Sequence, residues 1–302
     1  MSTSTLSIVR GRATWLTRVH DYIELSKPRI AVLVLVAVAV SYSVARWGQP
    51  DPRVLLHVLF GTLLIAASAS ALNQWLERRR DALMPRTRER PLPAGRLSGA
   101  ETVTVAVLAF LVGSLYLFVA VGWQPACWGV LTWLLYVWVY TPLKTRTYLN
   151  TAVGAVAGAL PVFIGWSAAG QSYDLRAGAL FWLLFLWQFP HFMAIAWIYR
   201  KQYARAGMKM LPVVEPTGAR AGMQAALAAW ALIPVSVIPA ISAPGWGGVI
   251  CSATVLALGV GQLLCAIAFL QNRGEATARR LLRASLVYLP AVLLILTLVP
   301  WV

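Results

Sequence analysis

The sequence predicts an all-α membrane protein that crosses the bilayer nine times, and two observations lead to this fold class. Of its 302 residues, 59% are hydrophobic and 12% are charged, whereas soluble domains are about half apolar and about a quarter charged. The apolar residues are also gathered into runs of the roughly 20 residues that a helix needs to cross a bilayer. A water-soluble globular fold is therefore excluded.

Nine apolar runs follow one another along the chain. They lie at about residues 30–47, 54–76, 102–122, 124–141, 148–169, 177–199, 221–241, 246–270 and 283–302. The fourth run is short and has Pro125 and Pro142 at its ends, so its helix is expected to be the least regular of the set. Each run predicts one transmembrane helix.

The first 29 residues are basic and contain no separate apolar segment before a cleavage site, so they do not resemble a secretory signal. Within them, residues 8–19 are compatible with a basic interfacial helix or a short transit-like peptide. We therefore expect a cytoplasmic segment at 1–29, followed by a single nine-helix membrane domain at 30–302.

The basic residues predict how the chain is oriented. When alternate loops are assigned to opposite sides of the membrane, all but three of the 26 Lys and Arg residues fall on one side, the exceptions being Arg46, Arg53 and Arg176. Such an excess of Lys and Arg is typical of cytoplasmic loops. We expect the N-terminus and the basic loops to be cytoplasmic in a bacterial plasma membrane, or on the matrix side in an organelle, with the C-terminus outside.

The net charge of +16 favours anionic headgroups or phosphorylated ligands as partners. Nucleic acid is not expected, because long apolar stretches interrupt the basic residues. The three cysteines lie singly in apolar runs without paired or metal-ligand spacing, so no disulfide framework is implied.

The ten carboxylates are few enough for their positions to be informative, and the richest stretch follows the second apolar run. Asn73, Glu77 and Asp81 are spaced by four residues, so a helix that continues towards Pro85 carries all three on one face. Two carboxylates about 6 Å apart repel each other by roughly 3 kcal/mol at an effective dielectric of 20. A divalent cation would offset this repulsion, and an amide with two carboxylates suits Mg²⁺, which completes its shell with water and ligand phosphates.

Arginines follow this acidic stripe directly. Arg86, Arg88 and Arg90 are able to contact the remaining phosphate oxygens in bidentate fashion. The alternative for the whole stretch is an ordinary helix end with i,i+4 ion pairs and the arginines of a cytoplasmic loop.

The loop between the fourth and fifth runs is also rich in polar groups. It offers Tyr140, Lys144, Arg146 and Asn150 within eleven residues, a combination that suits an anionic ligand. The alternative is a short basic loop on the cytoplasmic side.

Two polar side chains interrupt the sixth run. Gln188 and His191 lie one helical turn apart and should face the bundle interior, because polar groups facing lipid are unfavourable. They either contact a ligand or cap a backbone carbonyl freed by Pro190.

Together these motifs resemble the UbiA-type superfamily of intramembrane prenyltransferases, and within it the haem O synthase branch, over nearly the whole chain. The resemblance rests on Lys27, Pro28 and Arg29; on Asn73, Glu77, Asp81, Met84, Arg86, Thr87, Arg90, Pro91 and Gly95; on Tyr140, Lys144, Thr147 and Asn150; on Gly158, Pro161, Gly165 and Trp166; and on Pro190, His191, Phe192, Tyr203, Ala206, Gly207, Met210 and Pro212.

The resemblance implies a central cavity in which Mg²⁺ and farnesyl diphosphate bind, with haem B as the acceptor and haem O as the product for a downstream haem A synthase or terminal oxidase assembly. It implies that Asn73, Glu77 and Asp81 are the catalytic metal ligands. It further implies that the diphosphate is bound by Arg86, Arg90, Lys144, Arg146, Lys201 and Tyr203, and the acceptor by His191 and Gln188.

The sequence departs from the family at one position. Members usually carry an acidic residue just before the tyrosine of the loop after the sixth run, whereas Gln202 precedes Tyr203 here. An amide oxygen is a weak metal ligand, and Lys201 is able to neutralise a phosphate where the family would use a second Mg²⁺. We therefore expect either a one-metal enzyme or impaired catalysis.

Two alternative functions stay open at this point. One is another UbiA-type prenyltransferase that acts on an aromatic or quinone precursor. The other is a degenerate, non-catalytic membrane protein that binds haem, which the missing second acidic motif would favour.

Overall fold

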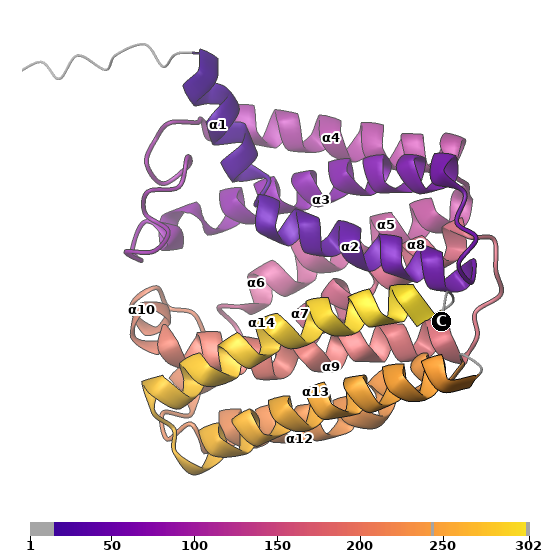
Figure 1. Ribbon diagram of the computed structural model, residues 1–302. Coiled ribbons are helices and arrows are strands. Elements are labelled where there is room, and N and C mark those ends of the chain that lie inside the picture. Colours follow the sequence, from indigo (N-terminus) through magenta and orange to yellow (C-terminus); the bar gives the residue numbers. More distant parts are fainter. Residues whose placement is uncertain (1–14, 243–244, 300–302) are drawn as a thin grey trace, which may run out of the picture.

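The computed structural model describes residues 15–242 and 245–299, and all regular elements in these ranges are helical (Figure 1). In chain order they are α1 (Trp15–Leu25), α2 (Pro28–Ala45), α3 (Pro52–Asp81), α4 (Gly99–Ala120), α5 (Trp123–Leu134), the π-helix η1 (Leu135–Tyr140), α6 (Thr141–Leu143), α7 (Asn150–Ala159), α8 (Pro161–Ala168), α9 (Leu175–Ile198), α10 (Arg200–Arg205), α11 (Leu211–Val214), α12 (Ala219–Val237), the 3₁₀-helix η2 (Ala240–Ser242), α13 (Gly245–Gln271) and α14 (Glu275–Leu298).

Eight helical stretches in the described ranges are long and apolar enough to cross a membrane. The fourth combines α5, η1 and α6, and the fifth combines α7 and α8, which meet at Pro161. The seventh predicted span corresponds to α12, whose polar Arg220 and Gln224 lower its hydropathy. Because α12 packs between α9 and α13, the structure agrees with a nine-span, all-α membrane fold.

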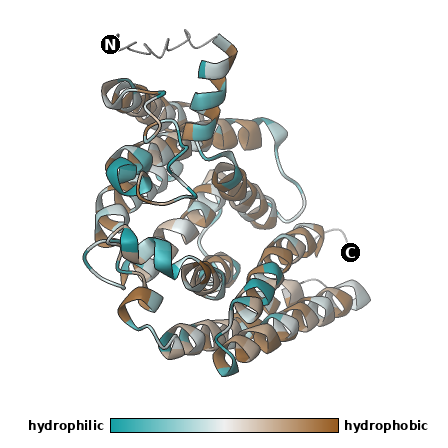
Figure 2. Cartoon of the chain, turned by 90° about the vertical axis from the view of Figure 1, so that its left-hand side faces the viewer, coloured by the Kyte–Doolittle hydropathy of each residue, from teal (hydrophilic) through white to brown (hydrophobic). Residues whose placement is uncertain are grey.

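The helices form two groups that meet along α2, α8, α9 and α14. Figure 2 looks onto the end of the molecule where the long basic loops lie. Small residues allow the closest crossings. A Cβ atom on Gly165 of α8 would lie 2.2 Å from the carbonyl oxygen of Val38 in α2, so these two backbones touch.

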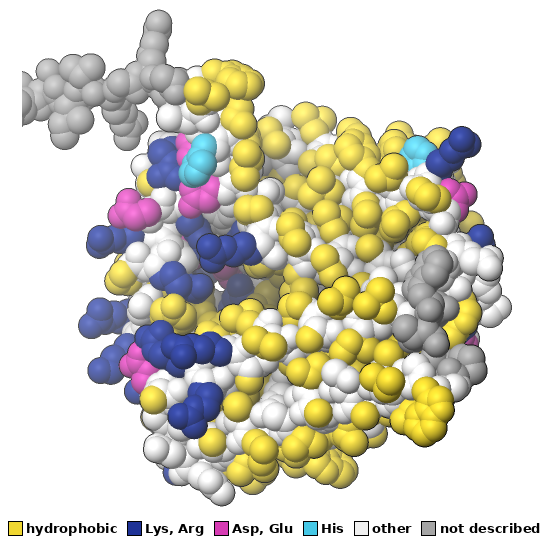
Figure 3. Space-filling model, in the orientation of Figure 1, with side chains coloured by type: hydrophobic (Ala, Val, Ile, Leu, Met, Phe, Trp, Pro, Cys, Tyr) yellow, Lys and Arg dark blue, Asp and Glu magenta, His cyan; other side chains and the backbone are white. Residues whose placement is uncertain are grey.

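The outer surface is apolar along the sides of the bundle, as expected for a multi-pass membrane protein. Large side chains are exposed there, including Val119 on α4 (75%), Trp230 on α12 (64%) and Leu264 on α13 (61%). In Figure 3 the Lys and Arg side chains gather at the left end, around a hollow in the surface, while the flank is mostly hydrophobic. This agrees with the charge asymmetry predicted from the loops.

Three irregular segments lie at the end of the bundle where the Lys and Arg side chains gather. Helix α3 continues beyond the apolar run to Asp81, as its polar stripe predicts, and leads into the loop of residues 82–98. The π-helix η1 widens one turn before α6. Helix α10 lies at the same end after α9 (Figure 1), and α11 contacts both α9 and α10.

Helix α1 lies at this end with its polar side turned towards the protein. Arg18 and the Tyr22 hydroxyl both donate to Glu101 at the start of α4. On the other side, Trp15 and Leu16 are 75% and 71% exposed. Of the predicted interfacial helix at 8–19, residues 8–14 lie outside the described ranges, and the observed helix continues to Leu25.

Candidate functional site

Asn73, Glu77 and Asp81 lie on one face of α3 and are almost completely buried, with 0%, 5% and 1% of their surfaces exposed. The four-residue spacing explains this alignment, because residues one turn apart on a helix share a face. Buried carboxylates require compensation by cations or hydrogen bonds. The structure therefore has to supply positive charge to this stripe.

Each member of the stripe has its own cationic partner, and each partner comes from a different segment. Lys27 Nζ donates to Asn73 Oδ1. Lys144 Nζ lies 2.8 Å from Glu77 Oε1, and Arg90 Nη1 lies 2.8 Å from Asp81 Oδ2. These long-range pairs differ from the i,i+4 pairs of an ordinary helix end.

Lys27 was not among the residues to which sequence analysis gave a role. It adopts a left-handed backbone conformation (φ 52°) just before Pro28, which costs a non-glycine residue about 1–2 kcal/mol. Gln74 of α3 holds the preceding turn through hydrogen bonds to the carbonyls of Glu24 and Leu25. Burial, followed by repulsion from Arg90, lowers the pKa of Lys27 to about 7.

Lys144 reaches the stripe from the end of the fourth span. Its ammonium lies 4.6 Å from the centre of the Tyr140 ring. Burial alone would lower the pKa of Lys144, but the Glu77 carboxylate and Tyr140 outweigh it and raise the pKa above its ordinary value. Next to it, the Thr141 hydroxyl accepts a 2.9 Å hydrogen bond from Asn73 Nδ2.

Arg86 and Tyr203 join the loop after α3 to α10. Arg86 Nη2 donates to the Tyr203 hydroxyl over 3.3 Å, and its guanidinium stacks on Tyr199 at 4.9 Å. Burial raises the pKa of Tyr203, which keeps its hydroxyl protonated. The two loops that were predicted to bind a diphosphate are thus in direct contact.

Hydrogen bonds also hold the loop between Lys144 and Asn150 against the segment that follows α10. The Lys209 amide donates to the Lys144 carbonyl over 2.7 Å, and the Asn150 side chain donates to the Lys209 carbonyl over 3.0 Å. Asn150 was predicted as a polar ligand group, and in the structure it holds the loops together.

Two of the predicted diphosphate-binding residues lie at the protein surface. Arg146 and Lys201 are exposed, and neither side chain forms a hydrogen bond or ion pair with the stripe or another site residue in the part of the chain that the structure describes. Their binding role stays a prediction. Next to Lys201, the Oε1 atom of Gln202 is buried and has no hydrogen-bond partner among the described residues.

Gln188 and His191 face the bundle interior, as predicted. Gln188 Nε2 donates to the Ala155 carbonyl over 2.9 Å and to the Leu184 carbonyl over 3.1 Å, so it acts as a carbonyl cap. His191 lies on Trp187, with ring centres 4.8 Å apart, and its Nδ1 is 3.0 Å from Ser285 Oγ. Acceptor binding by either residue stays a prediction.

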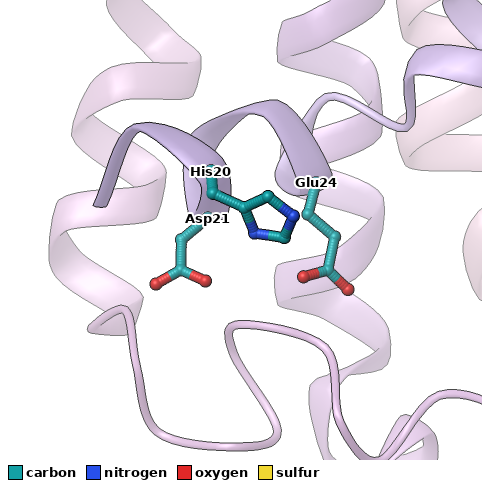
Figure 4. A group of neighbouring side chains, drawn as sticks. All are labelled: His20, Asp21 and Glu24. Atoms are coloured by element: carbon teal, nitrogen blue, oxygen red, sulfur yellow. The ribbon is translucent and has the colours of Figure 1, made fainter. Parts of the chain in front are cut away.

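A separate group of ligand-type side chains lies on α1, where His20, Asp21 and Glu24 have atoms within 4.8 Å of one another (Figure 4). Arg96 already neutralises both acids, with Nε 2.7 Å from Asp21 and Nη2 2.9 Å from Glu24. This group therefore fastens α1 to the loop of residues 82–98 and requires no metal.

The main site has the chemistry of a metal-assisted anion site. An amide and two carboxylates on one face supply the oxygen ligands that Mg²⁺ prefers, and the unpaired Gln202 oxygen is a further weak donor on the same end of the bundle. The three cations are able to pair with phosphate oxygens once a metal takes up the carboxylates. The residues present thus fit a magnesium diphosphate.

The fold and this site define an intramembrane prenyltransferase, and the chain belongs to the UbiA prenyltransferase family, whose sequence pattern matches residues 33–298. Curated relatives specify the branch. The chain is 47% identical to a protoheme IX farnesyltransferase of Rhodopirellula baltica over 91% of its own length and 98% of the relative's. It is 40% identical to another protein of that name from Solibacter usitatus, over 90% and 96% of the two lengths.

Solved structures share the fold. A structure reported for digeranylgeranylglyceryl phosphate synthase superposes with a TM-score of 0.74 at 16% identity, covering 94% of this chain and 98% of that one. A UbiA homologue from Archaeoglobus fulgidus, solved with GPP and Mg²⁺, gives a TM-score of 0.66 at 15% identity, covering 91% of this chain and 99% of that one.

Proposed function

We propose that this protein transfers the farnesyl group of farnesyl diphosphate to a vinyl group of haem B, giving haem O. The name shared by the curated relatives supports the substrate pair. The observation that carries the chemistry is the buried stripe of Asn73, Glu77 and Asp81 with one cation at each member.

The proposed reaction begins when the allylic C–O bond of farnesyl diphosphate breaks and its electrons leave with the pyrophosphate. Bound to Asn73, Glu77 and Asp81, Mg²⁺ would supply Lewis-acid stabilisation of that leaving group. The protein's own contribution is preorganised positive charge from Lys144 and Arg90, which does not have to be gathered at the moment of reaction.

The farnesyl cation then adds to the haem vinyl carbon, and water supplies the hydroxyl of the resulting hydroxyethylfarnesyl group while releasing a proton. The cation must be kept from bulk water before this step. Tyr136 and Tyr140, with ring centres 5.3 Å apart beside Lys144, present aromatic faces at the site. Such faces stabilise carbocations as they do other cations. We assign His191 and Gln188 to the haem side of the reaction.

The setting we propose follows from the charge distribution. The basic end would face the cytoplasm of a bacterium, with the C-terminus outside, so that both substrates enter from the inner leaflet. Haem O would pass to a haem A synthase or to a terminal oxidase under assembly.

The mass of haem extracted from cells that express this chain tests the proposal. Wild type should yield haem enlarged by a hydroxylated farnesyl group, whereas Asp81→Asn should yield unmodified haem, because the variant loses the charge that binds metal. Unmodified haem with wild type, together with altered quinones, would instead identify an aromatic or quinone precursor as the acceptor.

A further inference from the structure

A second basic site lies beside the catalytic stripe, between the end of α3 and α10. It is an open pocket of about 620 Å³, and Arg79 and Arg80 of α3 and Arg205 of α10 contribute to its wall. Glu77 and Asp81 are not among its lining residues. The pocket is therefore separate from the acidic stripe.

The pocket holds uncompensated positive charge. Arg78 also lines it, but donates to the Trp75 carbonyl over 2.6 Å and stacks on the Trp75 ring at 4.9 Å. The side chains of Arg79, Arg80 and Arg205 have neither an acidic partner nor a hydrogen bond in the part of the chain that the structure describes. Three free guanidiniums around one pocket repel each other, and an anion would relieve that repulsion.

The same pocket has an apolar edge. Leu76 and Leu83 line it, and Leu83 is 58% exposed. Leu76, Arg79 and Arg80, at i, i+3 and i+4, lie on one flank of α3, and Leu83 lies in the turn just beyond the end of this helix. A free phosphate would leave these leucines unused, whereas an amphiphile would contact them with its hydrocarbon part.

We propose that this pocket binds the phosphate headgroup of an anionic membrane phospholipid, with the start of an acyl chain against Leu76 and Leu83. The lipid bridges α3, which carries Asp81, and α10, which carries Tyr203. It thereby joins two elements of the catalytic end.

Lipid retention by the full-length protein tests this assignment. Wild type, Arg79→Gln/Arg205→Gln and the control Arg280→Gln/Arg283→Gln are purified in mild detergent, and titration with phosphatidylglycerol is followed by native mass spectrometry. The control removes two exposed charges from the same basic end. Each cation near an anionic lipid surface contributes about 1 kcal/mol, so the pocket variant should bind phosphatidylglycerol about 30-fold more weakly.

Three further measurements distinguish the ligand. Phosphatidylcholine should bind wild type and both variants equally weakly, and inorganic phosphate should displace phosphatidylglycerol only at high concentration. Equal phosphatidylglycerol binding by the pocket and control variants would overturn the proposal. So would a pocket variant that binds haem more weakly but keeps its lipid, because the site would then serve the acceptor's carboxylates.

Discussion

The pair formed by Glu77 and Lys144 allows stability and catalysis to be separated in one experiment. Their side chains are 6% and 11% exposed, and the charged atoms lie 2.8 Å apart. At an effective dielectric of 20 this attraction amounts to about 6 kcal/mol before desolvation is subtracted. Breaking a buried pair on one side typically costs about 3–5 kcal/mol, whereas replacing both partners by neutral groups is often close to neutral.

Glu77→Gln should therefore lower the free energy of unfolding by about 3 kcal/mol, because Lys144 stays buried and charged. Glu77→Gln/Lys144→Met should recover most of that loss. Farnesyl transfer, however, should stay at least about 100-fold below wild type in both variants, since the metal ligand is gone in each.

The assay combines thermal unfolding in detergent with conversion of haem B to haem O in nanodiscs, followed by mass spectrometry. Lys144→Met alone serves as the matched single variant. Recovery of transfer in the double variant would refute the assignment of Glu77 as a metal ligand. A double variant as unstable as Glu77→Gln would refute the account of the ion pair.

Other predictions concern packing, anchoring and metal. Gly158→Ala should lower the free energy of unfolding by about 1–3 kcal/mol, because the new Cβ atom would lie 2.4 Å from the Gln188 amide oxygen. Thermal unfolding measures this loss. Gly178→Ala is the control, since its Cβ atom would have no neighbouring atom within 4 Å. Arg96→Gln should speed hydrogen exchange in α1, and unchanged exchange would show that its two ion pairs do not hold that helix. Chelation of divalent ions should stop farnesyl transfer and added Mg²⁺ should restore it, so turnover that survives chelation would count against a metal-dependent reaction.

Much of the site could be predicted because helical periodicity is a local property. The spacing of Asn73, Glu77 and Asp81 was enough to align them, and the apolar runs were enough to identify the membrane fold. The interior orientation of Gln188 followed from the cost of facing lipid.

The partners of these residues could not be predicted, because tertiary contacts decide them. Lys27 reaches Asn73 only through a left-handed backbone that Gln74 supports from another helix. Arg146 and Lys201 carry the cationic side chains that bind phosphates, yet the conformation of their loops leaves both exposed. A lysine immediately before a proline, at the entrance to the first span, was the available signal for Lys27.

The π-helix η1 takes up one extra residue of this span within a single wide turn. Within it, the Thr141 amide donates to the Tyr136 carbonyl five residues earlier, so the turn contains one residue more than an α-helical turn. Deleting one residue between Leu135 and Tyr140 would therefore allow ordinary α-helical winding and leave Lys144 on nearly the same side of the helix. Deleting one residue from the α-helical turns of α5 instead would swing Lys144 by about 100° around the helix axis relative to the start of the span. Glu77 would then lose its counter-ion although neither residue had been altered, so the position of a deletion within the span decides whether the site survives.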